Sequence, residues 1–140
     1  MELEIPLERT FHCPEGSFRA TFKGARTHHR FRDGKIEELI RLTFEVDVPS
    51  IRNKTVTVAR NFPPSMAQGT QLRSMLESWL GGEFFQQNAG KNINLDDQMD
   101  RPAEIMVEHC RNEHFEDPYC NLIGIYAPGT LPRLGEFERD

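Results

Sequence analysis

The order of apolar patterns along the chain constrains its fold more than any other feature. Five runs have the composition and alternation of β-strands, and one has the period of an amphipathic helix. In chain order they predict strands over 17–26, 36–48 and 54–62, a helix over 69–80, and strands over 103–110 and 121–127. A chain of 140 residues is long enough for one well-buried core, so this order predicts a single, mainly β domain.

Periodicity also indicates which side chains form the core. In the first strand, apolar residues from Phe18 to Phe22 alternate with Arg19, Thr21 and Lys23, which fall on the other face. The apolar residues of the helix fall on one stripe, formed by Leu72, Met75, Leu76, Trp79 and Leu80. Because Trp79 lies within this stripe, we expect it to pack in the core and not to serve as a stacking platform.

A helix between the third and fourth strands of a five-stranded Greek-key barrel is the arrangement of an OB-fold-like domain. Such barrels commonly bind oligonucleotides or oligosaccharides, which favours a binding module over an enzyme. We expect residues 1–16 to form an N-terminal arm, 17–128 the OB-fold-like domain and 129–140 a C-terminal tail. The sheet edges of an open barrel would also permit pairing between copies, and hence a homo-oligomer.

The sequence also predicts the loops and turns between these elements. Thr27–Lys35 is expected to be a basic loop that joins the first two strands through a turn at Asp33-Gly34. Asn53-Lys54 is expected to form the turn of a second hairpin. Between the helix and the fourth strand, residues 83–102 are expected to form a connection of mixed apolar and polar composition. A polar hairpin loop is expected at Arg111–Pro118.

Charge is distributed unevenly along the chain. The net charge of −5 argues at first sight against nucleic acid, because binding to phosphates is largely electrostatic. However, residues 1–60 hold eleven of the seventeen Lys and Arg residues against nine acidic residues, whereas residues 61–140 hold six against thirteen. Residues 19–35 contain six basic residues and a single acidic one, Asp33, and so form a local basic stripe.

Metal binding and catalysis have weaker support in the sequence. Zinc-compatible side chains occur without the short paired spacings of zinc sites, at His12, Cys13, His109, Cys110, His114 and Cys120. Three acidic residues could indicate a divalent-metal site, but loops favour such residues in any case: Asp96, Asp97 and Asp100. There is no phosphate-binding glycine loop and no nucleophile motif, so we expect no cofactor and no catalytic activity.

The chain lacks a run of about 20 apolar residues that could span a bilayer, and it lacks a secretory signal. These features predict a soluble, cytoplasmic protein without membrane contact. The three cysteines are an odd number, which favours reduced thiols over a disulfide framework.

Four segments are informative when they are taken together. They are Pro14-Glu15-Gly16-Ser17-Phe18, Leu42-Thr43-Phe44-Glu45-Val46, the Leu72–Gly81 helix, and Ile105-Met106-Val107-Glu108-His109 followed by Asn121-Leu122-Ile123. Over residues 14–128 the sequence resembles phage and prophage proteins described as single-stranded-DNA-binding-like or recombination-associated, with an OB-fold. It departs from the family pattern at Met99-Asp100-Arg101-Pro102, where family members usually have a turn of the Ile-Gly-Lys type.

The resemblance implies a non-catalytic protein that binds single-stranded DNA, or RNA, in replication or recombination within a bacterial or phage-infected cell. Cationic side chains would follow the phosphates, and exposed aromatic rings would stack on bases. The candidates for phosphate contacts are Arg19, Lys23, Arg26, Arg30, Arg32, Lys35, Arg41, Lys54 and Arg60. Phe31, in the basic loop, is the first candidate for stacking, and Phe62, at a strand end, is the second.

A second hypothesis remains open at this point. The acidic excess after residue 60 would suit a protein-interaction module that recruits or inhibits a nucleic-acid-processing enzyme, such as a replication or recombination protein. In that case the partner would bind the acidic later half and the tail, and removal of residues 129–140 would abolish its capture without affecting folding.

Overall fold

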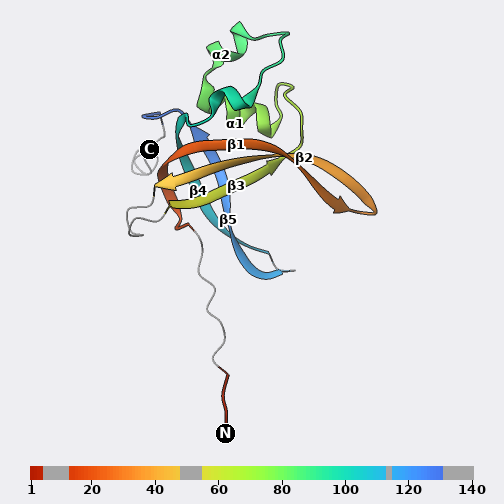
Figure 1. The fold of residues 1–140 in the computed structure, drawn as a ribbon, viewed down its shortest axis with the longest axis vertical. Helices are drawn as coiled ribbons and strands as arrows, with labels where there is room; N and C mark the ends of the chain where they lie inside the picture. Colours follow the sequence, from red (N-terminus) through yellow and green to blue (C-terminus); the bar gives the residue numbers. More distant parts are fainter. Residues whose placement is uncertain (5–12, 48–54, 113–114, 131–140) are drawn as a thin grey trace, which may run out of the picture.

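The protein is built around one antiparallel sheet with helices at one end (Figure 1). The computed structural model describes residues 1–4, 13–47, 55–112 and 115–130, and the side chains of these residues except for 55 and 110–119. The strands are β1 (Gly16–Arg32), β2 (Lys35–Asp47), β3 (Thr55–Phe62), β4 (Pro102–Asn112) and β5 (Phe115–Tyr126). The helices are α1 (Gln71–Leu80), α2 (Gly82–Gln87) and a short 3₁₀ helix, η1 (Leu95–Gln98). The prediction of a mainly β fold with five strands is confirmed, whereas the single helix predicted between the third and fourth strands is joined there by α2 and η1.

The five strands follow the order β3-β2-β1-β4-β5, and every neighbouring pair is antiparallel. In the described part of the chain, β3 and β5 form the two edges and are not paired with each other, so the sheet is not closed. The sheet is nevertheless curved enough that these edge strands come into contact (Figure 1). No helix within the described ranges is long and apolar enough to cross a membrane.

Three aromatic rings form the centre of the core. Trp79 of α1 packs against Phe22 of β1 and Phe44 of β2, with ring centroids 5.2 and 5.6 Å apart, and its indole nitrogen donates a hydrogen bond to the Pro102 carbonyl at 3.0 Å. The prediction that Trp79 belongs to the core is therefore confirmed, since almost none of its surface is exposed. The side chain of Thr70 caps the first turn of α1 by accepting a hydrogen bond from the backbone nitrogen of Arg73.

The hairpin of β1 and β2 is longer than its sequence pattern indicates. β1 continues to Arg32, so the prediction of a loop over Thr27–Lys35 is wrong, although the turn at Asp33-Gly34 is confirmed. Asp33 has φ of +52° and Gly34 has φ of +77°, as expected for a two-residue type I′ turn, which matches the twist of the flanking strands. Alternation reveals a strand only where one face is buried, and from Thr27 to Arg32 the side chains of β1 are exposed on both faces except for the half-buried His28.

The hairpin of β4 and β5 corrects a second loop prediction. Pairing between its strands continues to Asn112 and Phe115, so Arg111–Pro118 is not a loop and only residues 113–114 separate the strands. The segment 83–102, predicted as a mixed connection, holds most of α2 and all of η1. The predicted turn at Asn53-Lys54 lies outside the described residues, as do 5–12 of the arm and 131–140 of the tail.

A bulge in β1 determines which side chains share a face. Opposite β2, Lys23 is an extra residue between Phe22, which pairs with Phe44, and Gly24, which pairs with Thr43. One inserted residue moves every following side chain to the other face of the strand. Consequently the even-numbered residues after the bulge, and not the odd-numbered ones, lie on the outer face of the sheet. Gly24 has φ of +141°, a conformation that favours glycine.

Candidate nucleic-acid interface

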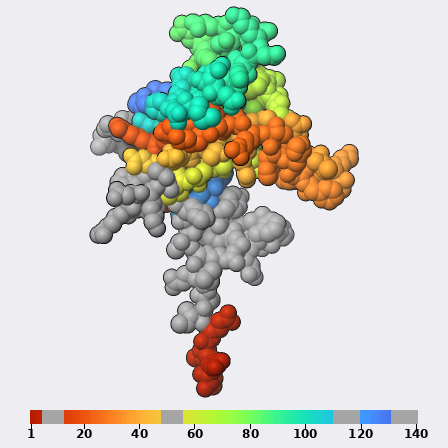
Figure 2. Space-filling model, viewed as in Figure 1, coloured from red at the N-terminus to blue at the C-terminus, as the bar shows by residue number. Residues whose placement is uncertain are grey.

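The register of the β1–β2 hairpin brings five basic side chains to one face. Residues directly opposite each other in an antiparallel pair share a face, as do residues two apart in one strand. Arg26 pairs with Arg41 and Arg32 pairs with Lys35, while Arg30 lies between them on β1. We call this set the cationic face: Arg26, Arg30, Arg32, Lys35 and Arg41, all of them exposed. The hairpin projects from the body of the protein, so solvent can reach this face (Figure 2).

Most of the positive charge on the cationic face is not neutralised. Arg30 forms an ion pair with Glu37 on the same face, with Nη2 2.6 Å from Oε2, and this hydrogen bond lowers the pKa of the Glu37 carboxyl. Arg41 donates to the side-chain oxygen of Asn61 on β3 at 3.1 Å, a neutral partner that leaves its charge in place. Within the described residues, no ion pair is formed by the remaining three cations, which are Arg26, Arg32 and Lys35.

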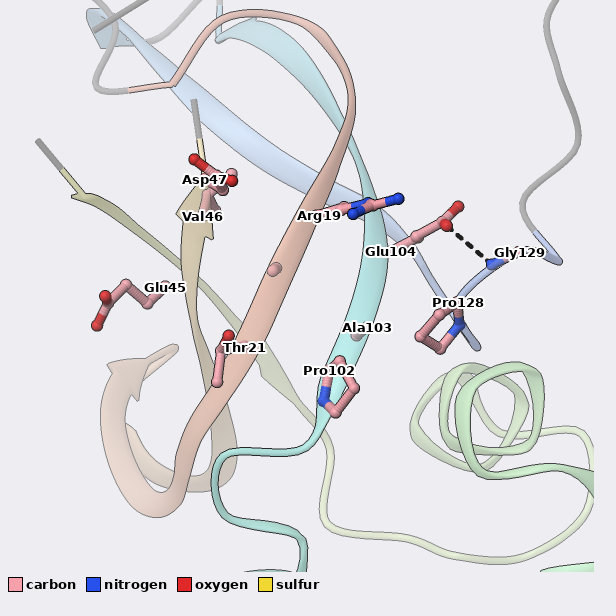
Figure 3. A pocket seen from close by; sticks show the side chains of 11 residues that line it. Arg19, Thr21, Glu45, Val46, Asp47, Pro102, Ala103, Glu104, Pro128 and Gly129 are labelled. Atoms are coloured by element: carbon pink, nitrogen blue, oxygen red, sulfur yellow. Dashed lines mark hydrogen bonds between the residues drawn. The ribbon is translucent and has the colours of Figure 1, made fainter. Parts of the chain in front are cut away.

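Two other predicted phosphate contacts lie in acidic surroundings. Lys23, the bulge residue, forms an ion pair with Asp100 at 2.7 Å, and this hydrogen bond raises the pKa of its ammonium group. Arg19 lines a pocket of about 580 Å³ together with carboxylates from neighbouring strands, namely Glu45, Asp47 and Glu104 (Figure 3). Because these carboxylates would repel a phosphate, neither cation belongs with the cationic face. Lys54 lies outside the described residues.

Arg60 and Phe62 are placed differently from the sequence prediction. Arg60 extends from β3 across to the other sheet edge, where its Nη1 donates a hydrogen bond to the Leu122 carbonyl of β5 at 2.7 Å. Its guanidinium also lies over the Phe62 ring, 5.1 Å from the centroid. Phe62 itself is completely buried, so its ring is not available to stack on a base. Arg60 therefore connects β3 to β5, and Phe62 packs in the core beneath its guanidinium.

Phe31 is exposed, as a stacking residue must be, and it has an apolar partner that the sequence reasoning missed. Ile36 lies directly opposite Phe31 across the hairpin, and 74% of Phe31 and 72% of Ile36 are exposed. Both lie on the face opposite the cationic face, because Phe31 alternates with Arg30 and Arg32 along β1. The two-residue turn at Asp33-Gly34 was the available signal, since it fixes this pairing.

Cys13, His109 and Cys120 tie the N-terminal segment to the last two strands. The Cys13 carbonyl accepts a hydrogen bond from the Cys120 thiol at 3.1 Å and lies 2.7 Å from Nε2 of His109. The Cys13 thiol is fully buried, and burial raises its pKa to about 11. Among the described residues, no group of three or more His, Cys, Asp or Glu side chains could hold a metal ion. His12 and His114 lie outside that part of the chain.

The aspartates considered for a metal site also have local structural positions. Asp96 and Asp97 lie in the first turn of η1, where Asn94 caps the helix by accepting a hydrogen bond from the Asp96 backbone nitrogen. Asp100 is the ion-pair partner of Lys23.

Comparison with known proteins adds no family to this description. No protein-family model matches the chain, and no curated protein matches it at a significant level. The function is therefore inferred from the geometry of the interface.

Proposed function

We propose that this protein binds single-stranded DNA without catalysing a reaction, and that the cationic face of the β1–β2 hairpin contacts the phosphates. The observation that carries the proposal is the convergence of five exposed basic side chains on one face of a projecting hairpin, in a chain whose net charge is −5. An excess of basic residues confined to one surface is the electrostatic footprint expected of a nucleic-acid-binding protein.

We further propose that the domain is OB-fold-like. Two observations support this assignment: the strand order β3-β2-β1-β4-β5, with β3 and β5 in contact, and the position of α1 between β3 and β4. In this arrangement the β1–β2 connection is one of the loops through which OB-folds bind oligonucleotides. The resemblance to phage single-stranded-DNA-binding-like proteins is consistent with the same role in replication or recombination.

The affinity for DNA should depend on salt concentration in a predictable way. Each phosphate that a cation neutralises on a single strand contributes about 0.7 to the slope of log affinity against log salt concentration. If all five cations of the cationic face contact phosphates, the slope has a magnitude of about 3.5. RNA would be bound through the same phosphates, so this term does not discriminate between the two nucleic acids.

The experiment is a fluorescence-anisotropy titration with a labelled oligo-dT strand of about 30 nucleotides, a length that exceeds the roughly 4 to 16 nucleotides contacted by one OB-fold. A duplex of equal length serves as the comparison, and the titration is repeated over a series of salt concentrations. We expect salt-sensitive binding with preference for the single strand. Absence of binding by the unmodified protein at low salt would overturn the proposal and direct attention to the protein-interaction hypothesis.

Two single substitutions localise the interface. Arg26→Ala removes a cation of the cationic face, whereas Lys91→Ala removes an exposed cation between α2 and η1, so both change the net charge equally. We expect Arg26→Ala to reduce the magnitude of the salt slope by about 0.7, and Lys91→Ala to leave it unchanged. Equal effects of the two substitutions would show that only the overall charge matters, and not the cationic face.

A further inference from the structure

The tip of the β1–β2 hairpin has two faces of different chemistry. Arg30, Arg32 and Lys35 lie on the cationic face, whereas Phe31 and Ile36 form a cross-strand apolar pair on the opposite face. Nearly three quarters of each apolar residue is exposed to solvent. Such exposure of two large apolar side chains has an energetic cost in water, which a ligand covering them would relieve.

The isolation of this pair limits what could cover it. Among the described residues, the other exposed large apolar side chains are Met1, Leu3 and Met99, none of which belongs to the hairpin, so the hairpin itself does not extend this apolar pair. A stable protein interface buries about 800 Å² on each partner and involves roughly 20 to 30 residues on each side, far more than these two residues supply. A nucleobase, in contrast, presents one flat face, which a single aromatic ring can cover.

The neighbouring charges favour the same ligand. The cations of the tip attract a polyanion, and Phe31 follows Arg30 and precedes Arg32 in the same strand. A strand whose phosphates are drawn to the cationic face brings its unpaired bases to within reach of the tip.

We propose that the Phe31–Ile36 pair is a binding surface for unpaired nucleobases of the same strand whose phosphates contact the cationic face. This inference rests on the proposed function, because it assigns a base-contacting role to the other face of the hairpin. Side chains on the two faces point in opposite directions, so one nucleotide does not contact both. The bound strand therefore passes around the hairpin tip, with successive nucleotides contacting different faces.

The test compares two labelled strands of equal length, oligo-dT and an abasic strand that has the same phosphates and no bases. Phe31→Ala is expected to weaken binding of oligo-dT by about 5- to 150-fold, the range that corresponds to the loss of one stacked base. The same substitution should leave binding of the abasic strand unchanged. Ile36→Ala should act in the same direction with a smaller effect, because isoleucine offers no ring for stacking.

Phe31→Trp provides a direct optical readout. The only native tryptophan, Trp79, is buried, so an indole at position 31 would be the exposed fluorophore of the variant. We expect oligo-dT to quench this added fluorescence and the abasic strand to leave it unquenched. The unfolding midpoint of each variant should equal that of the unmodified protein, because the tip lies outside the core.

The possible outcomes separate this inference from the proposed function. If the unmodified protein binds neither strand at low salt, both the proposed function and the inference fail. If it binds oligo-dT and Phe31→Ala binds equally tightly, the cationic face is retained as the interface and the base-contacting role of the tip is overturned. Equal weakening for oligo-dT and the abasic strand would also overturn that role, since it would show that the substitution disturbs the hairpin as a whole.

Discussion

Arg60 is expected to stabilise the fold and not to bind phosphates, and substitution by methionine tests this assignment. Methionine retains a long, flexible side chain but lacks the donors that reach β5. Arg60 is only partly exposed, and its charged hydrogen bond to the Leu122 carbonyl connects two strands that are not paired with each other in the described part of the sheet. Loss of that bond costs about 1.5 to 3 kcal/mol, because one partner is charged.

The contact between Arg60 and the Phe62 ring adds about 0.5 to 1 kcal/mol. Together these contributions predict that Arg60→Met lowers the free energy of unfolding by about 2 to 4 kcal/mol. With a denaturant slope near 2 kcal/mol per molar urea, the unfolding midpoint falls by roughly 1 to 2 M.

The assay is urea unfolding followed by the fluorescence of Trp79, which the core encloses and unfolding exposes. Arg41→Met is the matched control, because Arg41 is exposed, lies on the adjacent strand β2 and donates its hydrogen bond to a neutral side chain, that of Asn61. We expect Arg41→Met to change the unfolding midpoint little and to weaken DNA binding. An unchanged midpoint for Arg60→Met, combined with a reduced salt slope, would refute the structural assignment and make Arg60 a phosphate contact.

Three further predictions concern the rest of the domain. The pKa of the Cys13 thiol rises to about 11 on folding, from an ordinary value of 9.0, so the thiol ionises first in the unfolded chain. The stability that this thiol contributes should be fully present below pH 9 and should fall by about 2 to 3 kcal/mol as the pH rises to 11. Urea midpoints measured across that range should fall less for Cys13→Ala than for the unmodified protein, and parallel curves would contradict the prediction. Thr70→Ala removes the N-cap of α1 and should lower the free energy of unfolding by about 1 kcal/mol. Thr70→Ser keeps a capping hydroxyl and should retain most of that stability. Lys23→Ala breaks an exposed ion pair with Asp100 and should leave the midpoint of thermal denaturation nearly unchanged, because solvent screens exposed ion pairs.

Much of the fold could be predicted from the sequence because its core strands are half-buried. Where one face of a strand packs on the core, apolar and polar residues tend to alternate, and the central parts of β1 and β2 are visible in this pattern. The stripe of α1 and the burial of Trp79 follow from the same logic applied to a helix. The turn at Asp33-Gly34 could be predicted because positive φ at two successive residues favours this dipeptide.

The ends of both long hairpins could not be predicted in the same way. There the strands are held by backbone pairing beyond the core, and backbone hydrogen bonds leave no trace in the order of side chains. The residues of the candidate site were even harder to predict from the sequence. Basic residues could be counted along the sequence, but the count did not distinguish Arg26, on the exposed cationic face, from Arg60, whose side chain connects the sheet edges.

The sequence alone determined the element order, the apolar faces of the core strands and the concentration of positive charge in the first half of the chain. Tertiary structure decided which of those charges act together. The bulge at Lys23 exchanges the faces of β1, and thereby places Arg26, Arg30 and Arg32 with Arg41 while Phe31 joins Ile36 on the other side. The physical reason is that one inserted residue inverts the alternation of a strand, and only its pairing with a neighbouring strand shows where that residue lies.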